Sequence, residues 1–162
     1  MTRGGLLGRT SIGRALKAIA PRLAPEDAYA LARPIIDELK METDQLEIIN
    51  EAGSARRVSS TTIIRIIQLR ALLAQLKPED AYALARPMVE FMKNSKDQLS
   101  LWNIIFAELV SRMNQEQARG IAEAFYEATK GVKDADQLEA LGPGLKSVAP
   151  QLKPEDARMF GR

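Results

Sequence analysis

Adjacent carboxylates are the groups in this 162-residue chain that could most readily perform chemistry. Pro-Glu-Asp triplets begin at Pro25, Pro78 and Pro154. Paired carboxylates can act as general acid and base. A proline followed by two acids is also typical of the first turn of a helix, because the proline lacks an N–H that would be unpaired there and the acids complement the helix dipole. We therefore interpret the triplets as helix starts.

Other catalytic constellations are incomplete. The chain has no cysteine and no histidine, which excludes disulfides, thiolate nucleophiles, Cys/His zinc sites and histidine-based triads. Asp134 and Asp136 could ligate a hard cation, but two acids without a liganding loop fit a helix cap better. Residues 4–10 resemble a phosphate loop, yet the motif is one residue short, has arginine in place of lysine and follows no predicted strand. We predict no enzymatic activity, no metal site and no cofactor.

Basic side chains are the candidate binding groups. The net charge is only +2, but residues 1–24 and residues 52–77 each hold five bases and no acid, whereas residues 25–51 hold eight acids and two bases. Clustered bases attract a nucleic-acid backbone or an acidic peptide. The candidate partner-binding residues are Lys17, Arg22, Arg56, Arg57, Arg65, Arg70, Arg112 and Lys146. An ordinary solvated face is the interpretation we favour, because the four arginines between residues 56 and 70 do not share one helical stripe.

The basic N-terminus resembles a transit peptide in composition. We prefer to assign it to the first helix of the fold, because residues 16–27 recur later in the chain. The longest apolar stretches fall far short of a membrane span. We therefore expect no membrane partner and, by default, a cytoplasmic location.

Internal repeats organise the whole chain. Residues 23–34 (LAPEDAYALARP) and 76–87 (LKPEDAYALARP) differ at one position in twelve, a degenerate copy starts at Met113, and another opens at Leu152. The period is 37 and then 39 residues, while the first interval of 53 residues carries an insertion near residues 47–62. Such a period is typical of helical-repeat proteins. We predict one domain, 1–162, with repeats at 1–24 (a half repeat), 25–77, 78–114, 115–153 and 154–162 (truncated).

The sequence pattern of each repeat predicts two helices. The first-type helix begins at the Pro-Glu-Asp triplet, and the second-type helix begins at cap signatures such as Asp44 to Glu47, Ser95 to Gln98 and Asp134 to Gln137. Pro34 and Pro87 fall inside first-type helices and predict a kink in each. The predicted helices span residues 6–22, 26–41, 44–53, 61–76, 79–94, 96–113, 115–130 and 135–150, with a short helix from residue 155.

The motif Leu-x-Pro-Glu-Asp-Ala-x-x-Leu-Ala-x-Pro, with a proline inside the first helix of a 37–39-residue pair, resembles HEAT repeats and, more loosely, armadillo repeats. It is also similar to short tandem repeats of some bacterial multi-repeat proteins. The resemblance implies an all-α fold, a right-handed α-solenoid of antiparallel helix pairs whose second-type helices line the concave surface. The tetratricopeptide repeat is the alternative, but its Trp, Gly and Tyr pattern is missing.

Members of the HEAT class mostly act as protein scaffolds, and some bind nucleic acid. The resemblance therefore implies a non-enzymatic scaffold for a protein or peptide partner, with a nucleic-acid-binding solenoid as the alternative. Both ends of the chain carry apolar residues instead of a polar cap, so we also expect either a longer array or end-to-end self-association. Helical spacing predicts that Phe91, Trp102, Phe106, Phe125 and Tyr126 pack in the core.

Overall fold

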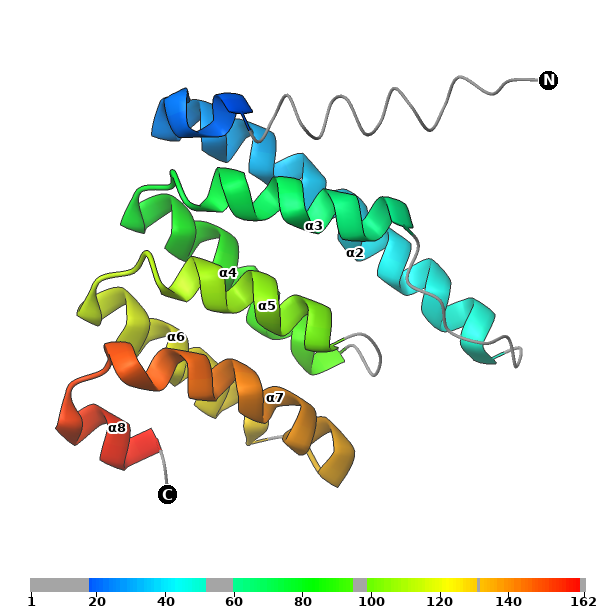
Figure 1. Ribbon diagram of the computed structural model, residues 1–162. Helices are drawn as coiled ribbons and strands as arrows, with labels where there is room; N and C mark the ends of the chain where they lie inside the picture. The colour runs from blue at the N-terminus through cyan, green and yellow to red at the C-terminus, as the bar shows by residue number, and fades with distance from the viewer. Residues whose placement is uncertain (1–17, 52–59, 95–98, 131, 161–162) are drawn as a thin grey trace. The chain divides into compact units, whose positions relative to one another are not determined.

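The computed structural model describes residues 18–51, 60–94, 99–130 and 132–160 (Figure 1). The α-helices are α2 (Pro25–Glu51), α3 (Ser60–Leu73), α4 (Pro78–Asn94), α5 (Leu99–Val110), α6 (Gln115–Thr129), α7 (Ala135–Val148) and α8 (Pro154–Phe160), with 3₁₀ helices η1 (Ala20–Arg22) and η2 (Ala149–Gln151). No strand occurs among these residues, which confirms the all-α prediction. No helix within the described ranges is long and apolar enough to cross a membrane.

The chain divides into two compact units, Met1–Leu76 and Lys77–Arg162, which we call the N-terminal and C-terminal units. The division falls one residue before the predicted start of the repeat at 78–114. In the N-terminal unit, α3 packs against α2 and also contacts η1. An ion pair joins the two long helices, with Arg65 Nη2 lying 3.2 Å from Glu38 Oε2.

Helix α2 corrects one sequence-based expectation. The predicted break between helices 26–41 and 44–53 is absent, because α2 runs without interruption from Pro25 to Glu51. The segment contains neither glycine nor proline after Pro34. A cap signature such as Asp44 to Glu47 acts only where the capping residue itself has a non-helical backbone conformation. With helix-forming residues on both sides, continued backbone hydrogen bonding is favoured over a new start.

The helices of the C-terminal unit form two layers (Figure 1). One layer holds α4, α6 and α8, and the other holds α5 and α7. Consecutive helices run in opposite directions, so α4 with α5 and α6 with α7 form two antiparallel pairs. The buried residues of α4 include Ala81, Leu84, Ala85, Met88 and Met92. They are spaced three and four residues apart, so they lie on one face of the helix.

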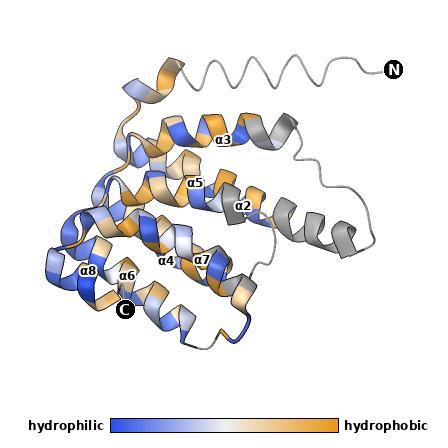
Figure 2. Ribbon diagram, turned by 60° about the horizontal axis from the view of Figure 1, so that its bottom comes forward, coloured by the Kyte–Doolittle hydropathy of each residue, from blue (hydrophilic) through white to orange (hydrophobic). Residues whose placement is uncertain are grey.

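Aromatic rings fill the core of the C-terminal unit. Trp102, Phe106 and Phe125 are fully buried. The rings of Phe91 and Trp102 meet edge-on with centroids 4.9 Å apart, and those of Phe106 and Phe125 do so at 5.2 Å. Hydrophobic residues run along α5, as the orange segments in Figure 2 show. Edge-to-face pairs of this kind contribute about 0.5–1.5 kcal/mol beyond their burial.

Tyr126 does not belong to the predicted aromatic core, and Phe91 is only half-buried. Its side chain is largely exposed and packs against Phe160 of α8, with ring centroids 6.0 Å apart. Phe125 and Tyr126 are neighbours on α6, so the two rings point in different directions, and only Phe125 can face α5. The expectation that Tyr126 belongs to the core was wrong for this reason.

Gly144 makes room for the Phe125 ring. A Cβ atom at this helical position would lie 2.6 Å from Phe125 Cζ and 3.3 Å from the Met92 terminal methyl carbon. The missing side chain therefore lets α7 approach α6 and α4 around a buried ring. By contrast, a Cβ at Gly142, two residues earlier in the same helix, would meet nothing within 4 Å.

We predict that Gly144→Ala destabilises the protein by about 1–3 kcal/mol, because the buried Phe125 ring must shift to admit the new methyl group. Urea unfolding followed by circular dichroism measures the difference. Gly142→Ala is the matched control and should change stability by less than about 1 kcal/mol, because nothing lies within 4 Å of the new methyl group and the gain in helix propensity is opposed by the proline that follows at position 143. Equal effects of the two substitutions would contradict the packing described at Gly144.

Candidate functional site

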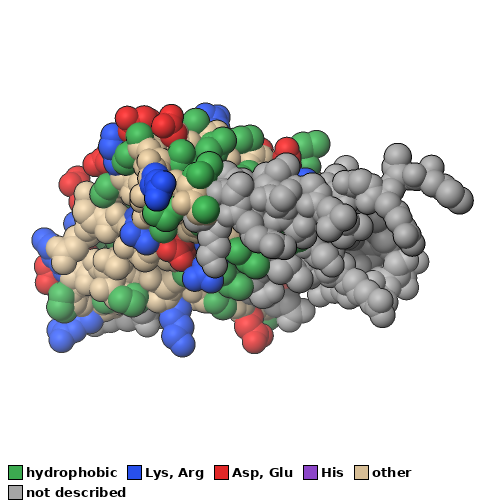
Figure 3. All heavy atoms as spheres, turned by 45° about the horizontal axis from the view of Figure 1, so that its top comes forward, with side chains coloured by type: hydrophobic (Ala, Val, Ile, Leu, Met, Phe, Trp, Pro, Cys, Tyr) green, Lys and Arg blue, Asp and Glu red, His purple; other side chains and the backbone are tan. Residues whose placement is uncertain are grey.

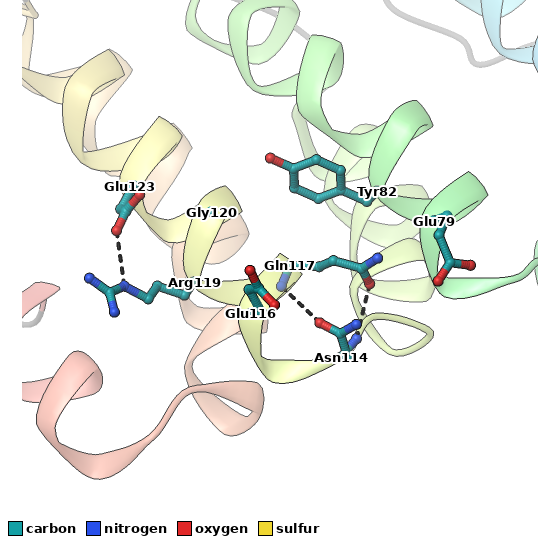
Figure 4. Close-up of a pocket in the computed structure, with 8 residues that line it drawn as sticks. All are labelled: Glu79, Tyr82, Asn114, Glu116, Gln117, Arg119, Gly120 and Glu123. Atoms are coloured by element: carbon teal, nitrogen blue, oxygen red, sulfur yellow. Dashed lines mark hydrogen bonds and ion pairs between the residues drawn. The ribbon is translucent and has the colours of Figure 1, made fainter.

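An open hollow of about 630 Å³ lies between α4 and α6 (Figure 4). Helix α4 supplies Glu79 and Tyr82, and α6 with its N-cap residue supplies the remaining lining residues, which are Asn114, Glu116, Gln117, Arg119, Gly120 and Glu123. We call this hollow the α4–α6 groove. All of it lies within the C-terminal unit.

A capping box holds the start of α6. The Asn114 side-chain oxygen accepts a hydrogen bond from the Gln117 backbone N–H at 2.9 Å, and the Gln117 side-chain oxygen accepts one from the Asn114 backbone N–H at 3.1 Å. This reciprocal pair satisfies two donors that a helix start leaves unpaired. The third repeat lacks the Pro-Glu-Asp triplet, and the capping box takes over its role as a helix start.

Tyr82 forms the wall of the groove on the α4 side. Its ring points from α4 toward α6 (Figure 4), where a Cβ at Gly120 would lie 3.1 Å from the phenol oxygen. Arg86, one turn further along α4, donates a long 3.4 Å hydrogen bond to the same oxygen. Glycine at position 120 therefore allows the Tyr82 ring to approach the backbone of α6.

The charges of the groove are predominantly negative. Arg119 Nε donates to Glu123 at 3.0 Å and lies 3.8 Å from Asp156 of α8. The hydrogen bond to Glu123, and then the nearby charge of Asp156, raise the pKa of Arg119. Glu79 and Glu116 are exposed and have no ion-pair partner among the described residues. The two free carboxylates of the groove are thus available to a cationic ligand.

The structure does not bring the predicted basic residues together into a described site. Lys17, Arg56 and Arg57 lie outside the described residues, as do the phosphate-loop-like residues 4–10 and the cap at 95–98. Arg65 is paired with Glu38, and Arg112 Nη2 lies 3.4 Å from Glu108 Oε1. These carboxylates reduce the charge that either arginine would present to phosphate.

The remaining candidates are exposed on separate helices. Arg22 ends η1 and Arg70 lies in the last turn of α3, both in the N-terminal unit, while Lys146 lies in the last turn of α7. Figure 3 shows one face of the molecule, on which acidic and basic side chains are interspersed. No group of three acidic residues that could hold a metal ion occurs in the described part of the chain.

Sequence reasoning identified Glu79 as part of a Pro-Glu-Asp triplet and gave it only a helix-start role, and it assigned no role to Glu116. The structure confirms that role, because α2, α4 and α8 all begin at the proline of their triplets. The positions of Tyr82, Gly120 and Glu123 beside them were missed. Aligning the repeats places Tyr82 at the same position as Arg119. This change of side chain was the signal that the contact between α4 and α6 differs from the contact between α6 and α8.

Comparison of the chain with protein-family models, with curated protein sequences and with solved structures gives no match.

We predict that Asn114→Ala destabilises the protein by about 1 kcal/mol, because the first turn of α6 loses the capping side chain. The free energy of unfolding in urea tests this value. Asn94→Ala, which removes the same side chain from the last residue of α4, should change stability by less than about 0.5 kcal/mol. A control variant as unstable as Asn114→Ala would argue against the capping role.

Proposed function

We propose that this chain is a non-enzymatic protein-interaction module. It would act as a HEAT-like, right-handed α-solenoid whose stacked helix pairs hold a binding surface in place. The α4–α6 groove would be that surface, and its partner a protein segment that carries lysine or arginine. The observation that carries the proposal is an open groove between two packed helices with two carboxylates, Glu79 and Glu116, that have no ion-pair partner among the described residues.

The layers of the C-terminal unit support a scaffold role. First-type helices α4, α6 and α8 follow one another in one layer, and α6 contacts both α4 and α8. Tyr82, the fifth residue of its repeat, contacts the start of α6, and Arg119, again the fifth residue, pairs with Asp156 in the start of α8. A surface built on repeated helix contacts is held rigidly, which reduces the entropy lost when a partner binds.

The chemistry of the groove favours a cationic segment. The charge of Arg119 is already compensated by Glu123 and Asp156. The negative charge that the groove presents to a ligand therefore comes from Glu79 and Glu116. Tyr82 offers a half-buried ring beside them, on which the alkyl part of a lysine or arginine side chain can rest. Each exposed ion pair contributes about 0.2–1 kcal/mol, so binding through two carboxylates is weak and salt-dependent.

The same geometry gives less support to the nucleic-acid alternative. Phosphate binding needs a concentration of uncompensated bases. Arg65 and Arg112, two of the candidate bases, are paired with carboxylates, and the described groove is acidic. We therefore propose a protein segment in preference to a nucleic acid.

We predict that a fluorescein-labelled peptide of alternating lysine and glycine binds the protein, and that Glu79→Gln and Glu116→Gln each weaken binding about two- to fivefold because each removes one carboxylate. Fluorescence anisotropy at low and high salt provides the measurement. Each variant should remain folded under the binding conditions and lose at most about 1 kcal/mol in urea unfolding, because one carboxylate near a helix N-terminus is removed.

Glu90→Gln is the matched control, because Glu90 is an exposed residue of α4 that does not line the groove. This variant should bind the peptide like the wild type. A peptide in which glutamate replaces lysine should not bind. Equal weakening by Glu90→Gln and Glu79→Gln would show that only overall charge matters, and the groove would then not be the site.

A further inference from the structure

The side chain of Arg119 lies between two sets of carboxylates at the edge of the α4–α6 groove. Its Nε atom donates to Glu123 at 3.0 Å and lies 3.8 Å from Asp156 of α8. Glu116, three residues before Arg119 on the same helix, has no ion-pair partner among the described residues. Figure 4 shows the Arg119 side chain extending away from Glu116 and toward Glu123. Arg119 is also the only base among the residues that line the groove.

Glu116 is within reach of the same guanidinium. Residues three and four apart on a helix are neighbours, so an arginine can pair with an acid three residues before it or with one four residues after it. Pairs in which the acid precedes the base are the more favourable, because the charges then agree with the helix dipole. A Glu116–Arg119 pair would have this order, whereas the observed Arg119–Glu123 pair has the reverse order. Helix α6 alone therefore does not favour the orientation of Arg119 that the structure shows.

Helix α8 supplies the additional attraction. Asp156 places a second negative charge on the Glu123 side of Arg119. Its side chain is 14% exposed and that of Glu123 is 51% exposed, so water and salt screen the charge of Asp156 less. Phe160, one turn later in α8, packs against Tyr126 with ring centroids 6.0 Å apart. This ring contact keeps α8 on α6 and therefore keeps Asp156 beside Arg119.

We propose that α8 regulates the α4–α6 groove through Arg119. While α8 is docked on α6, Asp156 keeps the guanidinium on the α8 side, and Glu116 is open to a cationic partner. When α8 is displaced, the guanidinium turns to Glu116 and occupies the carboxylate that the partner would use. This regulation rests on the proposed function, because it concerns the same groove and the same partner.

The two free carboxylates of the groove differ in this respect. Tyr82 of α4 has the repeat position of Arg119, so no arginine follows Glu79 after three residues. Displacement of α8 therefore closes the Glu116 half of the groove and leaves the Glu79 half open. A cationic segment should be bound more weakly in that state, but it should not be released completely.

Phe160→Ala tests the regulation without changing any charge. Loss of the ring contact with Tyr126 should displace α8, and the affinity for the lysine–glycine peptide should fall about two- to fivefold, as it does when the Glu116 carboxylate is removed. Met159→Ala is the matched control, because Met159 is the preceding residue of α8 and is 51% exposed. This control should bind the peptide like the wild type. Fluorescence anisotropy measures binding, and circular dichroism checks that each variant is folded.

Combined variants give the sharpest result. In the Phe160→Ala background, Glu116→Gln should have little further effect on peptide affinity, because Arg119 already occupies that carboxylate. Glu79→Gln should keep its full effect of about two- to fivefold in the same background. Arg119→Gln should restore at least the wild-type affinity to the Phe160→Ala variant, because no guanidinium then competes with the peptide.

Asp156→Asn is a second variant, in which the ring contact of α8 is kept. It should weaken peptide binding in the same direction as Phe160→Ala, because Arg119 loses its partner on α8. Glu155→Gln removes an equal charge from the neighbouring exposed residue, and neither acid lines the groove. The Glu155→Gln variant should bind the peptide nearly like the wild type.

NMR spectroscopy without peptide observes Arg119 itself. In the wild type, Glu116→Gln should leave the Nε–H signal of Arg119 in place, because the two side chains are not paired. In the Phe160→Ala background the same substitution should shift this signal. The measurement does not depend on the proposed partner.

Three results would overturn the proposal. The first is that folded Phe160→Ala and Asp156→Asn variants bind the peptide no more weakly than their controls. The second is a full effect of Glu116→Gln on binding in the Phe160→Ala background. The third is an Arg119 signal on which Glu116→Gln acts equally in the two backgrounds. A wild type that binds no lysine peptide would instead contradict the proposed function, and the NMR result would still decide whether Arg119 changes its partner.

Discussion

The structure of the C-terminal unit depends on the burial of Phe125. Its ring meets Phe106 of α5 edge-on, and it occupies the space that Gly144 leaves in α7. One side chain of α6 thus contacts helices of the other layer from both pairs. Because protein interiors are packed as densely as organic crystals, the position of this ring determines how closely the layers approach. Helix α6 and its N-cap supply most of the residues that line the α4–α6 groove, so the position of these residues follows from the same packing.

Repeated sequence made the helical architecture predictable. The Pro-Glu-Asp triplets give the starts of α2, α4 and α8 correctly, because a proline in the first turn and two acids near the dipole act locally and need no tertiary context. The start of α7 directly after Asp134 follows from a cap signature of the same local kind. The end of the first-type helix in the first full repeat was not predictable in this way. Nothing in the residues after Lys40 stops a helix, and the signal at Asp44 has no effect inside one.

The candidate site was harder to predict, because it depends on which residues of two helices face one another. Glu79 was predicted from the sequence to lie in a helix start, whereas the groove that it shares with Glu116 results from the packing of α4 on α6. The basic residues illustrate the opposite case. Arg65 and Arg112 were both candidate binding residues, but the fold places each beside a carboxylate. The Arg65–Glu38 pair joins different helices and cannot be detected by counting charges, whereas Arg112 and Glu108 are four residues apart on one helix, a spacing that the sequence itself shows.

The space at Gly144 also limits how freely the repeats of this chain could be exchanged. In the aligned sequences, the third repeat combines Phe125 with Gly144, whereas the second combines Met88 with Ile105 at the same two positions. The third repeat therefore combines a large residue with no side chain, whereas the second combines two residues of similar size. A recombinant that joined the first helix of the third repeat to the second helix of the preceding one would bring phenylalanine together with isoleucine, and the reciprocal recombinant would leave methionine opposite glycine. Crossovers between repeats should consequently be tolerated at the boundaries between helix pairs and selected against within a pair.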